Sequence, residues 1–284
     1  MLNLIKIIFL SLSLFISSCE KDISKNIANL TIDQKIQKCE EFYQKAVEDE
    51  FKLSFELKKW NPYLDECKNL AENGNADAQY WMGMIGQFST DKDGNPSYKN
   101  NVLFFLFIAN LNKHEEAQKE FNRLIKIYDK RDIAGFYLSM SNLYKKNPKE
   151  LSLKEVNYKK SWEMEKKAAS YGNILSYMGL GNAYASGSHY SYKVAKYFPE
   201  SYKWFFLAKN DYGSYHDGHG TDIKQNQETA QKILDKLESF MTKTQIEEAK
   251  IRTKKWLKEN PDFVPDMNEA LKKAENIKFK NTTK

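Results

Sequence analysis

The chain has 284 residues, of which 41% are hydrophobic and 29% are charged, so it is long enough for one or two globular domains. Its formal net charge is +6, but lysines and glutamates interleave along the chain as they do on solvated helix faces. The densest basic stretch, residues 272–284, is expected to be a frayed tail, with contact to anionic lipid as the alternative. This composition carries no signature of nucleic-acid binding.

The first eighteen residues are expected to form a cleavable secretory signal. Lys6 precedes an apolar stretch over residues 7–16, which is shorter than the ~20 apolar residues that a membrane-spanning helix needs. The sequence Ile-Ser-Ser-Cys at residues 16–19 resembles the lipobox of bacterial lipoproteins, in which a signal peptidase cuts before the cysteine and that cysteine is acylated. We therefore expect lipidation at Cys19; the alternative is an ordinary signal with a cysteine near the cut by chance.

The residue after this cysteine indicates which membrane would hold the protein. Glu20 stands where Gram-negative lipoproteins often carry an Asp when they are retained in the inner membrane. The absence of Asp at this position favours an outer-membrane anchor facing the periplasm, with residues 19–31 as a tether. Two or three acyl chains hold a protein far more firmly than one chain does.

Cys39 and Cys67 are the two cysteines that remain. An extracytoplasmic compartment permits disulfides, and residues 32–50 and 62–73 both read as helices, so a bridge would tie them into an N-terminal hairpin over residues 32–69. Closing such a loop contributes roughly 3–4 kcal/mol in the chain-entropy model. Two buried free thiols are the alternative, and no Cys/His spacing indicates zinc.

The rest of the chain is predicted to be helical. Apolar residues recur at spacings of three and four, as over residues 36–46 and 233–240, whereas runs of strict alternation are absent. Most of the six prolines lie where helices should begin or end. The expected fold class is therefore all-α.

Internal repetition adds an architecture to this prediction. Residues 71–83 and 169–184 share a Gly followed nine residues later by a second Gly, and a degenerate copy lies at residues 136–144. The segments 101–109, 161–169 and 201–208 share a second frame. Both frames resemble Sel1-like repeats, the TPR-like family with the pattern A-x-x-G-x-x-x-A-x-x-x-L-G-x-x-Y, then A-x-x-W-Y-x-K-A-A.

The resemblance covers roughly Leu70 to Lys258 and implies an α-solenoid of helical hairpins, in which residues 241–256 resemble the closing, capping helix. Gly74 and Gly172 should take positive φ at helix ends, and Gly83 and Gly181 should let paired helices approach closely. The order of first and second helices between residues 114 and 145 stays open. The expected organisation is a signal at 1–18, a tether at 19–31, a helical hairpin at 32–69, repeats at 70–212, a Gly/His loop at 213–224 and C-terminal helices with a basic tail at 225–284.

Candidate catalytic residues are few. His216 and His219 could bind a metal with Asp217 and Asp222, but a histidine pair in a Gly-rich loop is usually only solvated. No nucleophile elbow, Walker loop or HExxH motif occurs, so we expect no catalytic residue, no metal and no cofactor. A hydrolase that uses the His216 loop is the rival from another class.

The resemblance implies protein binding, because Sel1-like proteins act as adaptors and regulators. Some small lipoproteins among them resemble immunity proteins that neutralise secreted antibacterial effectors, notably phospholipases. An envelope scaffold or signalling adaptor is the rival within binding. Exposed aromatic residues on the inner helices would anchor the partner, the alternative being that these tyrosines pack between hairpins. The expected contact residues are Gln79, Tyr80, Gln87, Tyr137, Tyr177 and Asn182.

Overall fold

The computed structural model describes residues 26–48, 53–88, 99–146, 156–213 and 223–277. This part of the chain is almost entirely helical, as expected, and its strands are two dipeptides that form one small hairpin. The chain divides into two compact units, residues 1–126 and 127–284. None of the helices in the described residues is both long and apolar enough to cross a membrane.

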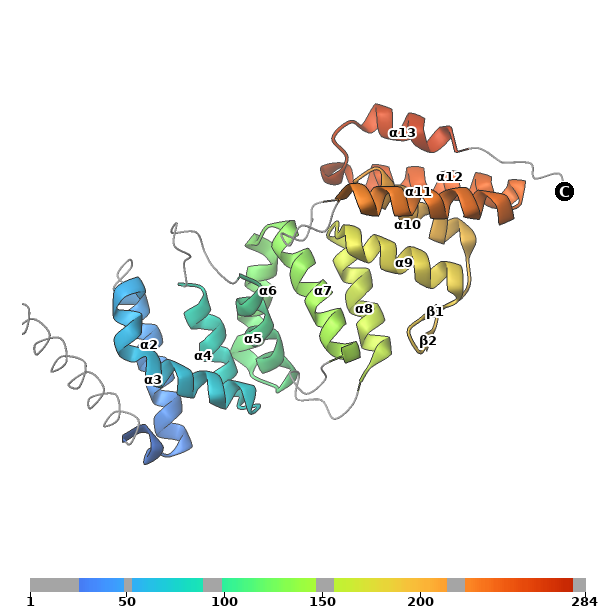
Figure 1. Cartoon of the computed structure of the whole chain (residues 1–284). Helices are drawn as coiled ribbons and strands as arrows, with labels where there is room; N and C mark the ends of the chain where they lie inside the picture. The colour runs from blue at the N-terminus through green and yellow to red at the C-terminus, as the bar shows by residue number, and fades with distance from the viewer. Residues whose placement is uncertain (1–25, 49–52, 89–98, 147–155, 214–222, 278–284) are drawn as a thin grey trace, which may run out of the picture. The chain divides into compact units, whose positions relative to one another are not determined.

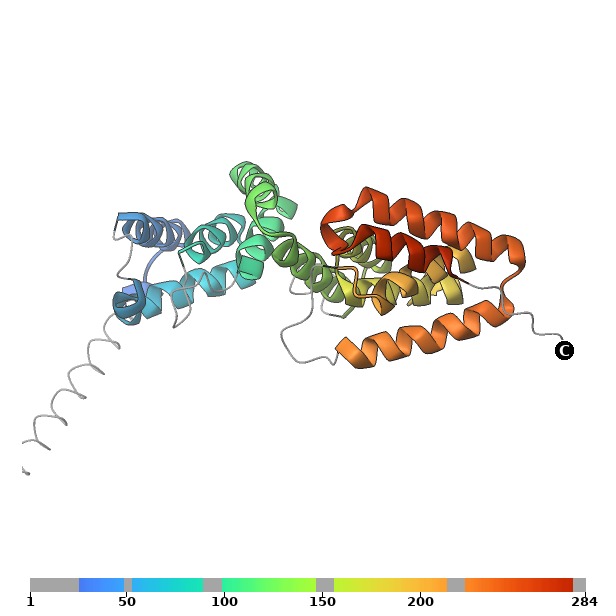
Figure 2. The same ribbon diagram turned by 90° about the horizontal axis from the view of Figure 1, so that it is seen from above.

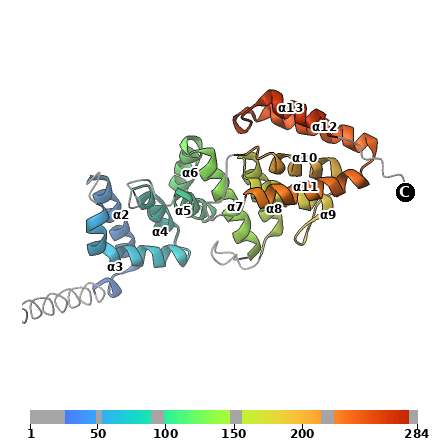
Figure 3. The ribbon, with the colours of Figure 1, turned by 45° about the horizontal axis from the view of Figure 1, so that its top comes forward.

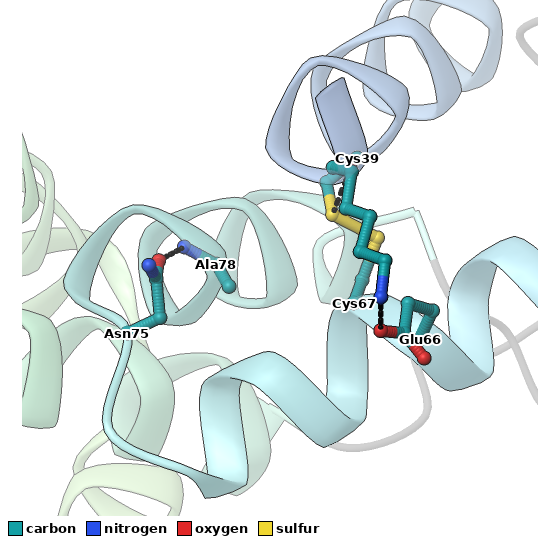
Figure 4. Close-up of a disulfide and its surroundings, with 6 residues drawn as sticks. Cys39, Glu66, Cys67, Asn75 and Ala78 are labelled. Atoms are coloured by element: carbon teal, nitrogen blue, oxygen red, sulfur yellow. Dashed lines mark hydrogen bonds and ion pairs between the residues drawn. A yellow bond between two sulfur atoms is a disulfide. The ribbon is translucent and has the colours of Figure 1, made fainter. Parts of the chain in front are cut away.

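The first unit contains the N-terminal hairpin and its neighbours. Its helices α2, α3 and α4 pack against one another, and α4 also packs against α5 (Figure 3). Cys39 on α2 and Cys67 on α3 form a disulfide, with their Cα atoms 5.8 Å apart (Figure 4). Both cysteines are buried, so the bridge lies inside the hairpin. The helices are α2 (Ile32–Glu48), α3 (Leu53–Glu72), α4 (Ala76–Gly86), α5 (Lys99–Leu111) and α6 (Glu115–Ile127).

The second unit begins with two helical hairpins, α7 with α8 and α9 with α10 (Figure 1). Helices α11 and α12 pack on α10, and α13 packs on α12 (Figure 2). The elements are α7 (Lys130–Lys146), α8 (Tyr158–Ser170), α9 (Ile174–Ser186), β1 (Ser188–His189), β2 (Tyr192–Lys193), α10 (Phe198–Lys209), α11 (Ile223–Phe240), α12 (Lys243–Glu259), a 3-10 turn (Pro261–Phe263) and α13 (Met267–Glu275).

One turn geometry recurs directly after α3 and α8. Gly74 and Gly172 have φ values of 90° and 86°, as expected for residues just past a helix C-terminus. The next residue is an asparagine in both cases, and its side chain caps the following helix: Asn75 accepts from the Ala78 amide and Asn173 from the Ser176 amide, both at 2.8 Å (Figure 4 shows the former).

The same turn is present where the sequence signal is lost. Lys113 takes the place of the glycine, with a φ of 69°, and Nδ1 of His114 accepts a 3.1 Å bond from the Ala117 amide. A lysine is sterically disfavoured at positive φ, so a lysine at this position does not predict such a turn from the sequence. This turn lies directly before α6. Because α7 packs against α8, α7 is the first helix of its hairpin, which answers the question left open for residues 114–145.

Small residues let the paired helices approach closely. A Cβ on Gly83 would lie 2.7 Å from the Leu106 side chain, and one on Gly181 would lie 2.8 Å from the Phe205 ring. The close-approach role expected for both glycines is therefore confirmed. Ser141 occupies the corresponding place between α7 and α8, forty residues before Gly181.

The two hairpins of the second unit share a further contact at that forty-residue offset. The Asn157 amide donates to the Tyr144 carbonyl at 2.8 Å, and the Tyr197 amide donates to the Tyr184 carbonyl at 2.9 Å. Each bond joins the end of a first helix to the start of its partner. The two pairs therefore fold alike although few of their side chains are identical.

Candidate partner-binding site

Several residues selected from the sequence lie outside the described part of the chain. These are Cys19, the proposed lipidation site, and the loop histidines His216 and His219. Among the residues that the structure describes, no three His, Cys, Asp or Glu side chains gather so that they could hold a metal ion.

Two of the three tyrosines expected to contact a partner lie inside the second unit. Tyr177 is fully buried, with its ring 5.4 Å from that of Trp204 and 5.7 Å from that of Trp256. Tyr137 is 5% exposed and its ring stacks on Tyr171 at 5.7 Å. The assignment of Tyr137 and Tyr177 to a binding surface is therefore wrong, because neighbouring helices cover both rings.

The polar residues expected to contact the partner include both buried and exposed side chains. Gln79 is 1% exposed; its amide donates to the Ala71 carbonyl at 2.9 Å, and its carbonyl accepts from Asn112 at 2.8 Å. Gln79 thus satisfies buried backbone and side-chain groups, and its assignment to the surface is also wrong. Asn182 is exposed on α9.

Tyr80 and Gln87 remain partly exposed, and they lie beside a group of aromatic side chains in the first unit. The ring centroids of Tyr80 and Trp81 are 4.9 Å apart, and the Tyr43 ring lies 5.4 Å from Trp81 and 5.8 Å from Phe88. All four rings are half-buried. We name Tyr43, Tyr80, Trp81 and Phe88 the aromatic face; it joins α2 to α4 and the residues just after α4.

A polar rim from α6 borders the aromatic face. Gln87 donates to Glu120 at 3.1 Å, and Arg123 makes a bidentate ion pair with Glu120 at 2.6 and 2.8 Å. The hydrogen bonds from Arg123 lower the pKa of Glu120. This pair lies within α6, and because both of its members also bond to Gln87, it holds Gln87 in place beside the rings.

His114 completes the rim next to Tyr80. Its ring stacks on Tyr80 with centroids 4.4 Å apart and an interplanar angle of 18°. Nε2 of His114 lies 3.4 Å from a carboxylate oxygen of Asp77, one turn before Tyr80 on α4. The residue that caps α6 therefore also orients Tyr80.

The electrostatic surroundings of the two tyrosines are acidic. Burial raises the pKa of Tyr80, and the neighbouring Tyr43, Glu120, Glu116 and Glu40 raise it further. Burial and Glu120 likewise raise the pKa of Tyr43, whereas Arg123 lowers it. Both hydroxyls are therefore protonated at neutral pH and can donate hydrogen bonds.

The second unit holds a buried polar cluster that the sequence did not reveal. Oε2 of Glu165 on α8 lies 2.7 Å from Nε2 of His189 on β1, and accepts from Ser141 on α7 at 3.2 Å. Ser141 and Ser161 are 3.1 Å apart, and the Lys145 ammonium lies 4.0 Å from the same carboxylate oxygen. We name these five residues the Glu165 cluster.

Two features of the neighbouring helices explain how a carboxylate fits there. Glu165 stands forty residues before Phe205, so it fills with a polar group the place that an aromatic ring fills in the next hairpin. Gly179 makes room for it, since a Cβ on Gly179 would overlap with Oε1 of Glu165. The only sequence signals are a glutamate in an apolar frame and a glycine that the repeat pattern does not require.

The Glu165 cluster differs from a serine–histidine–carboxylate triad. Ser141 and His189 bond to the same carboxylate oxygen, Oε2 of Glu165, so the imidazole does not stand between the serine and the carboxylate. Nδ1 of His189 is buried, and no residue that the structure describes forms a hydrogen bond with it. The cluster instead ties α7, α8 and the strand hairpin together.

The chain was compared with protein-family models, with curated proteins and with solved structures, and none of them matches. The aromatic face and the Glu165 cluster are therefore interpreted from their own contacts, burial and charge. The aromatic face is the candidate site for a partner, because large side chains are partly exposed there and held by neighbouring residues.

Proposed function

We propose that the chain is a lipid-anchored, protein-binding protein of the Gram-negative envelope, held at the periplasmic face of the outer membrane, and that the aromatic face is its contact surface. The observation that carries this proposal is the set of four touching, half-buried rings on the first unit. Protein interfaces are enriched in tyrosine, tryptophan and phenylalanine, and a few such residues supply most of the binding energy.

A Sel1-like α-solenoid is the architecture that we propose for the helical part. The recurring helix–turn–helix at Gly74, Lys113 and Gly172 supports it, as does the forty-residue offset between the two hairpins of the second unit. In such arrays each hairpin buries its apolar face against its neighbours, and the extended surface that results binds other proteins.

The specific role that we propose is immunity, the neutralisation of a secreted antibacterial effector such as a phospholipase. The resemblance to Sel1-like lipoproteins supports it by analogy. The anchor at Cys19 supports it physically, because an inhibitor tethered to the membrane meets a membrane-attacking toxin where that toxin acts. An envelope scaffold or signalling adaptor is the alternative use of the same surface.

The binding proposal is tested with the product of the neighbouring gene and with Tyr80→Ala. Tyr190→Ala is the matched control, because Tyr190 is 58% exposed and belongs to the second unit. Removing an anchor of this kind should weaken binding at least about tenfold, whereas the control should bind as the unaltered protein does. Equal affinity of the two variants, or early melting of Tyr80→Ala, contradicts the surface assignment.

The immunity role has its own test. The neighbouring secreted protein is directed to the periplasm of cells that do or do not produce this chain. Survival only in the presence of the chain, and its loss with Tyr80→Ala, is the expected result. Binding without protection favours the scaffold or adaptor.

A further inference from the structure

We propose that the aromatic face receives a basic segment of its partner, one that presents Lys or Arg side chains among apolar residues. This inference rests on the proposed function and names the chemistry of the occupant. Its support is the juxtaposition of half-buried rings with carboxylates from three helices.

The carboxylates surround the rings on α2, α4 and α6. Asp77 lies one turn before Tyr80 on α4, with its side chain 57% exposed, and Glu40 lies one turn before Tyr43 on the exposed side of α2. On α6, the negative charges of Glu116 and Glu120 both raise the pKa of the Tyr80 hydroxyl.

Cations balance this charge only in part. Lys119 pairs with Glu116 at 2.6 Å, and Arg123 pairs with Glu120 at 2.6 Å. Asp77 has His114 as its neighbour, at 3.4 Å. In the described part of the chain, two of these four carboxylates pair with a permanent cation, although the chain as a whole carries a formal charge of +6.

This local reversal of sign favours one kind of occupant. An acidic segment would be repelled by the rim of the aromatic face and would find better sites elsewhere on a basic protein. A Lys or Arg side chain gains from the carboxylates and from the faces of Tyr80 and Trp81, because an aromatic ring attracts a cation placed over it. Apolar residues between the basic ones would cover the remaining ring surface.

The test uses the full-length, lipidated protein in cells. A photo-crosslinking benzoylphenylalanine replaces Tyr80, and in a control it replaces Glu72, which is exposed at the end of α3 on the same unit. The crosslinked partner peptide is then identified by mass spectrometry. A segment with several Lys or Arg, captured from position 80 and not from position 72, is the expected result.

The other outcomes separate the two proposals. Capture of an acidic segment, or of one without Lys or Arg, overturns the basic-segment inference and leaves the proposed function standing. Capture of lipid only, or no capture from position 80, overturns both.

Charge variants provide a second readout on the segment once it has been identified and synthesised. Glu40→Gln and Glu116→Gln should each weaken its binding about threefold at low salt, and less at 0.5 M salt, because exposed charges are screened. Glu72→Gln, the same change on the same unit, should leave the affinity unchanged. Equal effects of all three variants, or none from any of them, overturn the inference.

Discussion

Replacing Glu165 with alanine should destabilise the second unit more than any other removal of a single carboxylate in it. The substitution takes away the acceptor of His189 and of Ser141 and the counter-charge of Lys145. These partners are buried: His189 is 4% exposed, and the Lys145 side chain is 7% exposed. Water therefore does not replace the lost carboxylate.

The size of the effect follows from what each partner retains. Breaking a buried ion pair by removing one member costs about 3–5 kcal/mol. Ser141 still has Ser161 at 3.1 Å, and the Lys145 ammonium still lies 4.5 Å from the centre of the Tyr190 ring. We therefore expect a loss near the lower end, about 3 kcal/mol, which lowers the melting temperature by about 6–12 °C in a unit of this size.

The measurement is thermal and urea unfolding of the chain from residue 20 onward, followed by tryptophan fluorescence. The Trp162 ring lies 5.2 Å from that of His189 and reports directly on the Glu165 cluster. Glu163→Ala, two residues away on the same helix and partly exposed, is the control and should change stability by less than about 0.5 kcal/mol. Equal losses for the two variants would refute the reasoning, as would strict additivity of Glu165→Ala and His189→Ala in a double-mutant cycle.

Three further predictions concern other parts of the chain. Replacing Cys39 and Cys67 by serine should cost the first unit about 3–4 kcal/mol in urea unfolding, and the denatured unaltered protein should show no reactive thiol from this pair without reductant. Burial raises the pKa of Tyr144 to about 12 and that of Tyr177 well above its usual value. Both stay protonated in the native state while the unfolded chain ionises, so the free energy of unfolding should fall as pH rises from about 10 to 12, in step with tyrosinate absorbance. Cys19→Ala should move the protein into the soluble periplasmic fraction and abolish acyl labelling; unchanged membrane association would rule out the lipid anchor.

Local features of the fold were predictable from the sequence because they depend on neighbouring residues. Apolar spacings of three and four mark helices, and the positive φ at Gly74 and Gly172 follows from the need for a residue without a Cβ at a helix end. The close approach at Gly83 and Gly181 follows from the same internal repetition. The first two inferences use residues within about one or two turns, and the third compares similar short segments elsewhere in the chain.

The candidate binding surface and the Glu165 cluster depended on contacts between distant residues, and only the tertiary structure decided those. Tyrosine is both large and polar-tipped, so its place in a repeat does not tell whether a later helix will cover it. Tyr177 on α9 is buried in part by Trp256, whereas Tyr80 on α4 stays partly exposed. Glu165 and His189 meet because a strand hairpin folds back onto α8. The spacing of these residues along the chain does not predict that contact.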